Sequence, residues 1–216
     1  KMIQYYKTIN NKLETLNSFE EGCWINIVKP NQNEINEIVN LLGIDYDTIK
    51  SALDEEERSR IDIEDNHTLI IIDTPIDESD NDSSLYTTIP LGIILLENAL
   101  VTVCTTQTKI LNEFTTSHVK DFYTYKKTKF ILQILHKNAS YYLYYLRKIN
   151  KLTTTIEKEI YSSMKNEQLI QLLELEKSLI YFSTSLKANE VVLNKIVRTN
   201  AIKKYPDDED LLEDVL

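Results

Sequence analysis

Short apolar runs separated by turn signals make up the first half of the chain. Runs rich in β-branched and aromatic residues are typical of strands. Six such runs occupy residues 2–6, 24–28, 61–63, 69–73, 86–96 and 99–105. Residues 69–72 are apolar throughout, as expected of a strand buried on both faces of a sheet. Glu97 and Asn98 suit a tight hairpin turn before the last run.

Helical spacing interrupts the strands after Pro30. Four apolar residues recur on one helical face, namely Ile35, Ile38, Val39 and Leu42. Asn33 can accept hydrogen bonds from the free amides of the first turn, and Gly43 supplies a left-handed end. A second, shorter helix should begin at Asp45 or Asp47 and lead into the charged run 54–60. Up to residue 119 we therefore expect an α/β layer.

From Lys126 onward apolar residues recur alternately every three and four positions, which predicts long helices paired as in a coiled coil. The first seam consists of Leu135, Ala139, Tyr142, Leu146, Ile149, Thr153, Ile156 and Ile160. The second consists of Leu172, Leu175, Leu179, Phe182, Leu186, Asn189, Leu193 and Ile196. A short break near Lys165 and Asn166 makes them antiparallel neighbours over residues 120–205. Pro206 should end the second helix, and the acids after it favour a new helix over 206–216.

A formal net charge of −10 restricts the partners of this chain. Nucleic-acid binding relies on clustered Lys and Arg, so we expect no nucleic-acid partner. The acid excess suits divalent cations, or serves only to keep the domain in solution. No apolar run approaches the roughly 20 residues of a spanning helix, and we expect no signal peptide or lipid anchor. Cys23 and Cys104 lie in separate strand patterns, which predicts buried free thiols.

The residue patterns of common enzymes are missing from the sequence. Three glycines cannot build a phosphate-binding loop. His67, His118 and His136 have neither the helical pairing nor the Cys companions of zinc sites. The carboxylates Glu55 and Glu57 belong to a charged run, which is usually a solvated face. We therefore expect no catalysis.

Three segments resemble the cytoplasmic domain of the CorA-type magnesium channel family. They are WINIVKP with LLGIDYDTIKSALDEEERSRIDIEDNHTLIIID, then IPLGIILLENALVTVCT, and finally DDEDLLEDVL. The resemblance implies an α+β fold: a mixed β-sheet sandwiched by helices (α/β/α) over residues 1–119, a helical hairpin packed on it over 120–205, and the start of a stalk helix over 206–216. It also implies the cytoplasmic portion of an inner or plasma membrane protein, a homopentamer whose membrane segments lie beyond Leu216.

In proteins of this family, Mg²⁺ held by carboxylates between neighbouring cytoplasmic domains keeps the pore closed. Gap-free matching from Trp24 through Gly43 places the family's acidic pair on Lys50 and Ser51, and its partner on the stalk helix on Asp214. The resemblance thus implies a subunit interface at these positions. Because Lys50 is a cation, we expect Lys50 of one copy to pair with Asp214 of the next.

Further metal ligands follow from the same resemblance. A looser match places one ligand of a second site on His136. Asp54 and Glu55, one turn beyond Lys50, and Asp210 in the acidic run before Asp214 are candidate replacement ligands. The implied regulatory ion is Mg²⁺, which prefers carboxylate oxygens, with Co²⁺ and Zn²⁺ as alternatives.

Three other functions are compatible with the sequence. The zinc-transporting branch of the same family shares these patterns. A soluble scaffold would use the helical hairpin to bind partner helices. A metal-dependent hydrolase would use the acids around Asp54 together with His67, and requires these side chains to converge on one cleft.

Overall fold

The computed structural model describes residues 2–79, 83, 85–162, 166–199 and 201–215. Within these residues lies one seven-stranded sheet in the order β2-β1-β3-β7-β6-β5-β4. Its strands are β1 (Ile3–Ile9), β2 (Lys12–Leu16), β3 (Cys23–Val28), β4 (Arg60–Ile63), β5 (His67–Asp77), β6 (Tyr86–Leu96) and β7 (Ala99–Cys104). β3 and β7 are parallel, and the other neighbouring pairs are antiparallel. The sheet is therefore mixed, as predicted.

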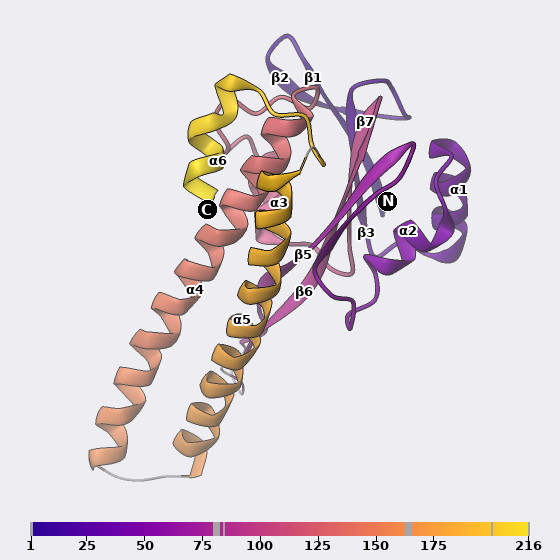
Figure 1. The fold of residues 1–216 in the computed structure, drawn as a ribbon. Coiled ribbons are helices and arrows are strands. Elements are labelled where there is room, and N and C mark those ends of the chain that lie inside the picture. Colours follow the sequence, from indigo (N-terminus) through magenta and orange to yellow (C-terminus); the bar gives the residue numbers. More distant parts are fainter. Residues whose placement is uncertain (1, 80–82, 84, 163–165, 200, 216) are drawn as a thin grey trace.

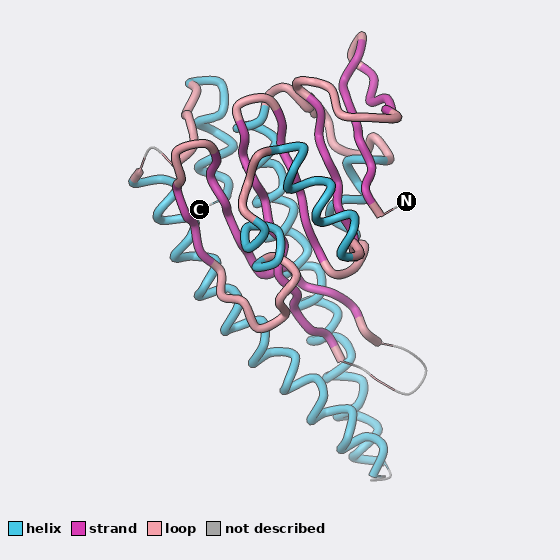
Figure 2. The backbone as a smooth tube through the Cα atoms, turned by 90° about the vertical axis from the view of Figure 1, so that its right-hand side faces the viewer, coloured by secondary structure: helices cyan, strands magenta, loops and turns pink. Residues whose placement is uncertain are grey.

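Helices cover both faces of the sheet (Figures 1 and 2). One face carries α1 (Gln32–Leu42) and α2 (Tyr46–Ser51), and the other carries α3 (Lys109–Thr115), α4 (Lys127–Ser162), α5 (Asn166–Arg198) and α6 (Glu209–Val215). Successive side chains of a strand point to opposite faces. In β3, Trp24 accordingly enters the core beneath α4, whereas Ile25 and Ile27 enter the core beneath α1. This arrangement confirms the predicted fold class.

The predicted end of α1 and the predicted start of α2 are confirmed, whereas the start of α1 differs from the prediction. Asn31, and not Asn33, is the N-cap: its side chain accepts from the amides of Asn33 and Glu34, and Glu34 completes a capping box. Gly43 ends α1 in the left-handed conformation, with φ 64°. Asp45 precedes α2 as predicted.

The end of α2 lies directly on the sheet. A Cβ atom added to Gly92 of β6 would lie 2.4 Å from the Cβ atom of Ala52, the C-cap residue of α2. Only glycine at this position of β6 permits so close an approach.

The helices α4 and α5 form the predicted hairpin, with 36 and 33 residues. They lie side by side and extend well beyond the sheet (Figure 1). The structure confirms Tyr142, Ile149 and Ile156 as buried seam positions of α4. In α5 the structure confirms Leu175, Phe182, Asn189 and Ile196 as buried seam positions. The other buried residues of α5 are Ser178, Ser185 and Val192, whereas the predicted Leu179 and Leu186 are exposed.

Other elements were missed or misplaced. β1 and β2 are joined by Asn10 and Asn11, both at positive φ, as a type I′ hairpin turn requires. Neither β2 nor α3 was predicted. α5 ends at Arg198, so Pro206 does not end it but opens a short 3₁₀ turn (Pro206–Asp208) that leads into α6.

Two predictions from composition can also be compared with the structure. Cys23 and Cys104 are buried free thiols, as predicted. Among the described residues, no helix is long and apolar enough to cross a bilayer.

Candidate functional site

Two of the three residues predicted at a subunit interface lie on α2, where Lys50 is exposed and Ser51 is half-buried. Lys50 extends over the ring of Tyr46, with its Nζ 5.9 Å from the ring centroid. The Ser51 hydroxyl donates to the carbonyl oxygen of Asp47 (2.7 Å) and accepts from Nη2 of Arg60 (3.3 Å). Of the two, Lys50 is therefore the side chain that is available to a second molecule.

The predicted metal ligands near α2 lie in the loop that follows it. Asp54 is exposed, and its Oδ1 accepts from the backbone amide of Glu56 (3.0 Å). Glu55 is also exposed and lines a groove at the edge of the sheet. Neither carboxylate forms an ion pair within the described part of the chain.

The other predicted ligands lie on the opposite side of the sheet and do not form a cluster. Asp210 and Asp214 are exposed on α6, which packs on α4, and His136 is half-buried on α4. Figure 1 shows α6 and α2 on opposite sides of the sheet. Among the described residues, no three His, Cys, Asp or Glu side chains come close enough to hold a metal ion. A single chain therefore does not bring Lys50 to Asp214 or assemble the predicted metal site.

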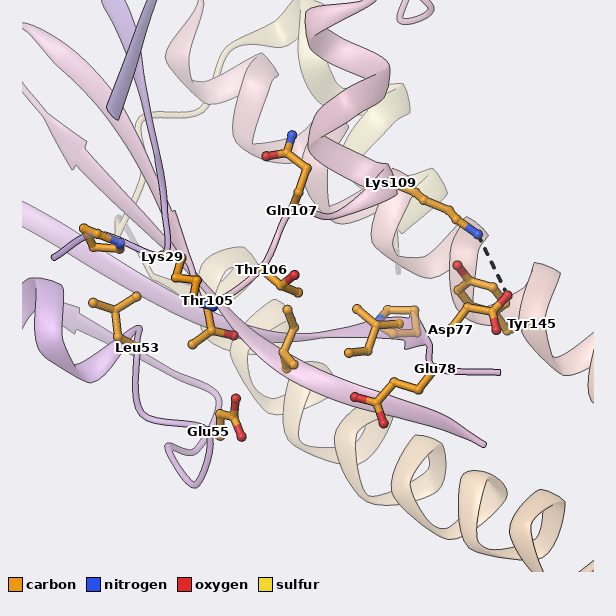
Figure 3. Close-up of a pocket in the computed structure, with 14 residues that line it drawn as sticks. Lys29, Leu53, Glu55, Asp77, Glu78, Thr105, Thr106, Gln107, Lys109 and Tyr145 are labelled. Atoms are coloured by element: carbon orange, nitrogen blue, oxygen red, sulfur yellow. Dashed lines mark ion pairs between the residues drawn. The ribbon is translucent and has the colours of Figure 1, made fainter. Parts of the chain in front are cut away.

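A groove lies where the two parallel strands end (Figure 3). The chain leaves β3 for α1 on one face and leaves β7 for α3 on the opposite face. Such a divergence of two neighbouring parallel strands opens a crevice at their carboxyl ends. The groove has a volume of about 670 Å³. It is lined by Lys29, Pro30, Leu53, Glu55, Pro75, Ile76, Asp77, Glu78, Ile89, Thr105, Thr106, Gln107, Lys109 and Tyr145.

Charges of both signs face this groove. Asp77 lies 3.4 Å from Nζ of Lys148 and 3.9 Å from Nζ of Lys109. Burial acts to raise the pKa of Asp77, but hydrogen bonds from Ser79 and the charge of Lys148 outweigh it, so the pKa is lowered. Lys29 has a positive φ of 49°, an uncommon conformation for a residue with a side chain. This lining suits the binding of a small polar group.

The hydrolase hypothesis requires Asp54 and His67 to share a cleft. His67 is buried at the start of β5, where its Nδ1 lies 2.7 Å from Oδ1 of Asn66. It lines a different cavity from Glu55, and that cavity includes none of residues 54–57. The structure therefore gives the hydrolase hypothesis no support.

A cluster of hydrogen bonds that was not predicted from the sequence connects the α4–α5 hairpin to β5. Asn189 of α5 accepts from the amide of Asp73 (2.8 Å) and donates to its carbonyl oxygen (2.8 Å). Asn138 and Tyr142 of α4 donate to the same carbonyl oxygen, at 2.9 and 3.1 Å. Burial raises the pKa of the Asp73 carboxyl and of Tyr142. The one signal in the sequence was a polar residue, Asn189, within an apolar seam.

The comparisons with known proteins agree on one family. A family model described as CorA-like Mg²⁺ transporter protein matches residues 19–216. The cobalt/magnesium transport protein CorA of Methanocaldococcus jannaschii is 25% identical over 218 residues, which cover 96% of this chain and 65% of that protein. The chain thus spans less than two thirds of this curated relative.

Solved structures share the fold. The soluble domain of CorA from Methanocaldococcus jannaschii superposes with a TM-score of 0.83 at 24% identity, over 99% of this chain and 87% of that one. The ZntB cytoplasmic domain from Vibrio parahaemolyticus superposes with a TM-score of 0.74 at 11% identity, over 98% and 86%.

Proposed function

Because the chain belongs to the CorA-like Mg²⁺ transporter protein family, we propose that it is the metal-sensing regulatory domain of a divalent-cation transporter. The family is one of transporters, and the proposed role involves no catalysis. Mg²⁺ and Co²⁺ are the ions in the name of the curated relative, and we propose both as cargo. The net charge of −10 favours cations near the domain.

The placement of α2 and α6 on opposite sides of the sheet carries this proposal. Surfaces on opposite sides of one molecule can meet only between copies. A contact that joins two different surfaces of neighbouring copies closes into a ring when its rotation permits. We propose a homopentamer in which α2 of each copy faces α6 of the next, with Mg²⁺ as the regulatory ion at this contact.

At this interface the proposed partners are Lys50 and Ser51 of one copy and Asp214 of the next. Both Lys50 and Asp214 are exposed and form no ion pair among the described residues. The ammonium group of Lys50 would take one bridging position beside Asp214, so that Mg²⁺ at this contact would be held by other ligands. Asp54, Glu55, Asp210 and His136 are the proposed further ligands, because each of them reaches the surface of the single chain.

Reversal of one charge tests this interface. In the full-length protein, Lys50→Glu should make assembly depend more strongly on Mg²⁺ than it does in the wild type, because two facing carboxylates repel each other until a cation bridges them. Sedimentation velocity with and without excess Mg²⁺ measures the assembly. Lys12→Glu is the matched control, since Lys12 is exposed on the edge strand β2, and it should leave the metal dependence unchanged. Equal metal dependence in Lys50→Glu and the wild type would contradict the proposed contact.

The membrane assignment has its own test. We propose that the domain is the cytoplasmic portion of an inner or plasma membrane protein, with its spanning segments beyond Leu216. The native coding region past Leu216 should then contain two hydrophobic segments with Gly, Met and Asn between them. A hydrophilic continuation would instead favour a soluble scaffold.

A zinc-transporting function is the second candidate, because the ZntB cytoplasmic domain has the same fold. Calorimetric titration of the domain with Zn²⁺ and with Mg²⁺, followed by uptake assays of the full-length protein, separates the two. Uptake of Zn²⁺ without uptake of Mg²⁺ would replace the first proposal.

A further inference from the structure

A half-buried carboxyl group lies where the α4–α5 hairpin meets the sheet. Asp73 follows the stretch of β5 that pairs with β4, and its partner in β6 is Pro90. Its main chain is bound by both helices of the hairpin, through Asn138 and Tyr142 of α4 and Asn189 of α5. A change of charge on Asp73 therefore acts at the point where both helices attach to the sheet.

Among the described residues, no cation is paired with this carboxyl. Ser185 of α5 donates a hydrogen bond to it, and Tyr142 of α4 is its titratable neighbour, whose own pKa is raised by burial and by the charge of Asp73. Arg60 of β4 forms ion pairs with other carboxylates. Burial disfavours the ionised form of an unpaired carboxyl, so the pKa of Asp73 is raised although Ser185 acts to lower it.

An unsatisfied acceptor beside Asp73 indicates that a hydrogen-bond donor is missing. Nδ2 of Asn138 donates to the Asp73 carbonyl oxygen (2.9 Å), but its Oδ1 is buried and has no partner among the described residues. Buried acceptors in native proteins nearly always have a donor. A protonated carboxyl has an O–H donor, whereas a carboxylate can only accept. The protonated form of Asp73 therefore supplies the kind of group that this cluster lacks.

We propose that Asp73 is a pH-sensitive switch that controls how firmly the α4–α5 hairpin is attached to the sheet. Protonation removes an unpaired, partly buried charge and adds a donor to the cluster, so it strengthens the attachment. Ionisation places a desolvated negative charge beside both helices and weakens it. The step moves one proton between the carboxyl and solvent, and it needs neither a metal ion nor a second copy. The inference thus goes beyond the proposed function and is tested independently of it.

The switch has a defined pH dependence. Because the pKa of Asp73 is raised in the folded chain, its contribution to stability is complete below the unfolded value of about 3.9 and is lost as the pH rises through the folded value. Asp73→Asn keeps a neutral side chain of similar shape at every pH. The variant should unfold at a higher urea concentration than the wild type at about pH 7, and the two midpoints should converge below about pH 4.

Hydrogen exchange in the presence of EDTA locates the effect in the hairpin. Once exchange is corrected for the intrinsic rate at each pH, the amides of α4 and α5 over the sheet should be better protected in Asp73→Asn than in the wild type at about pH 7. This difference should disappear in acid together with the difference in stability. Asp121→Asn makes the same replacement at an exposed position before α4 and should match the wild type at every pH.

A second variant and a direct titration complete the test. Ser185→Ala removes the hydroxyl that favours the ionised form, so it should move the transition to higher pH in the wild type but not in the Asp73→Asn background. Carbon-13 NMR of the Asp73 carboxyl in the wild type should give a midpoint above about 3.9, and it does not depend on any variant folding. The proposal would be overturned by a midpoint at or below this value, by an Asp73→Asn chain that unfolds more easily than the wild type at about pH 7, or by a gain in stability without slower exchange in α4 and α5.

Discussion

The side chain of Asn189 forms hydrogen bonds with the backbone of β5 at a position where β5 has no neighbouring strand on that side. β4 pairs with β5 from Arg60, opposite Ile71, so no strand residue faces Asp73 on that side. The Asn189 carboxamide accepts from the Asp73 amide and donates to its carbonyl oxygen, as a neighbouring strand residue would. Because both backbone groups of Asp73 are satisfied by side chains, its partner in β6 can be Pro90, which has no amide to donate.

Asn189→Leu should therefore destabilise the fold. It preserves the approximate size of the side chain but leaves the Asp73 amide without a partner, which costs about 1–3 kcal/mol of unfolding free energy. Urea unfolding followed by circular dichroism measures the loss. The control is Asn150→Leu, an identical replacement at an exposed position of α4, where we expect a change within about 0.5 kcal/mol. Equal stability of the two variants would contradict the role assigned to Asn189.

The α5 helix shows where apolar patterns predict packing and where they do not. The predicted seam contained Leu179 and Leu186, yet these are 43% and 37% exposed. The neighbouring Ser178 and Ser185 are buried instead. The Tyr86 amide donates to Ser178 Oγ (2.9 Å), and Ser185 Oγ lies 3.0 Å from Thr88 Oγ1. The two serines of α5 thus form hydrogen bonds with β6, one to a backbone amide and one to a threonine hydroxyl. A pattern of apolar residues does not predict such polar contacts.

The helix α3 is held to α4 by a cluster of charge and hydrogen bonds. Glu113 of α3 lies 2.5 Å from Nζ of Lys137 and accepts from the Tyr141 hydroxyl at 2.6 Å. Burial acts to raise the pKa of Glu113, but the bonds from Lys137 and Tyr141 outweigh it and lower the pKa. A lowered pKa in the folded state stabilises the fold above the unfolded pKa of about 4.3, and this stability is lost as the pH falls through the folded value.

Glu113→Gln should consequently lower the free energy of unfolding by an amount that depends on pH. The free energy of unfolding of the wild type should exceed that of the variant by about 1 kcal/mol at pH 7. This difference should shrink once the pH falls below about 4.3 and disappear below the lowered pKa that Glu113 has in the folded state. Urea unfolding at a series of pH values measures it. Glu157→Gln, at an exposed position of α4, should show no such trend. A difference that persists unchanged in acid would mean that the charge of Glu113 contributes nothing.

The arrangement of the whole chain explains why the fold was more predictable than the site. Buried strands such as β5 and β7 and the long helices have strong periodic signals that predicted these elements, and the resemblance to the CorA-type family implied the α/β/α layers. The short polar strand β2 and the seven-residue α3 have weak signals and were missed. The candidate ligands lie on opposite sides of one chain, so their convergence depends on contacts between copies, which remain a prediction.

The distance between the candidate ligands within one chain leads to a prediction about metal ions. With 34 acidic and 24 basic residues, the dilute chain should be stabilised by salt through screening of its own repulsion. Because no described group of acids can hold an ion within one chain, MgCl₂ and CaCl₂ should raise the melting temperature equally at matched concentration.

A Mg²⁺-specific increase should appear only in the full-length protein, and it should grow with protein concentration, since an ion bound between copies is linked to assembly. Differential scanning calorimetry at several protein concentrations distinguishes these cases. A saturable Mg²⁺-specific increase in the dilute domain would instead locate the sensing site within one chain, and ring formation would then not be needed to complete it.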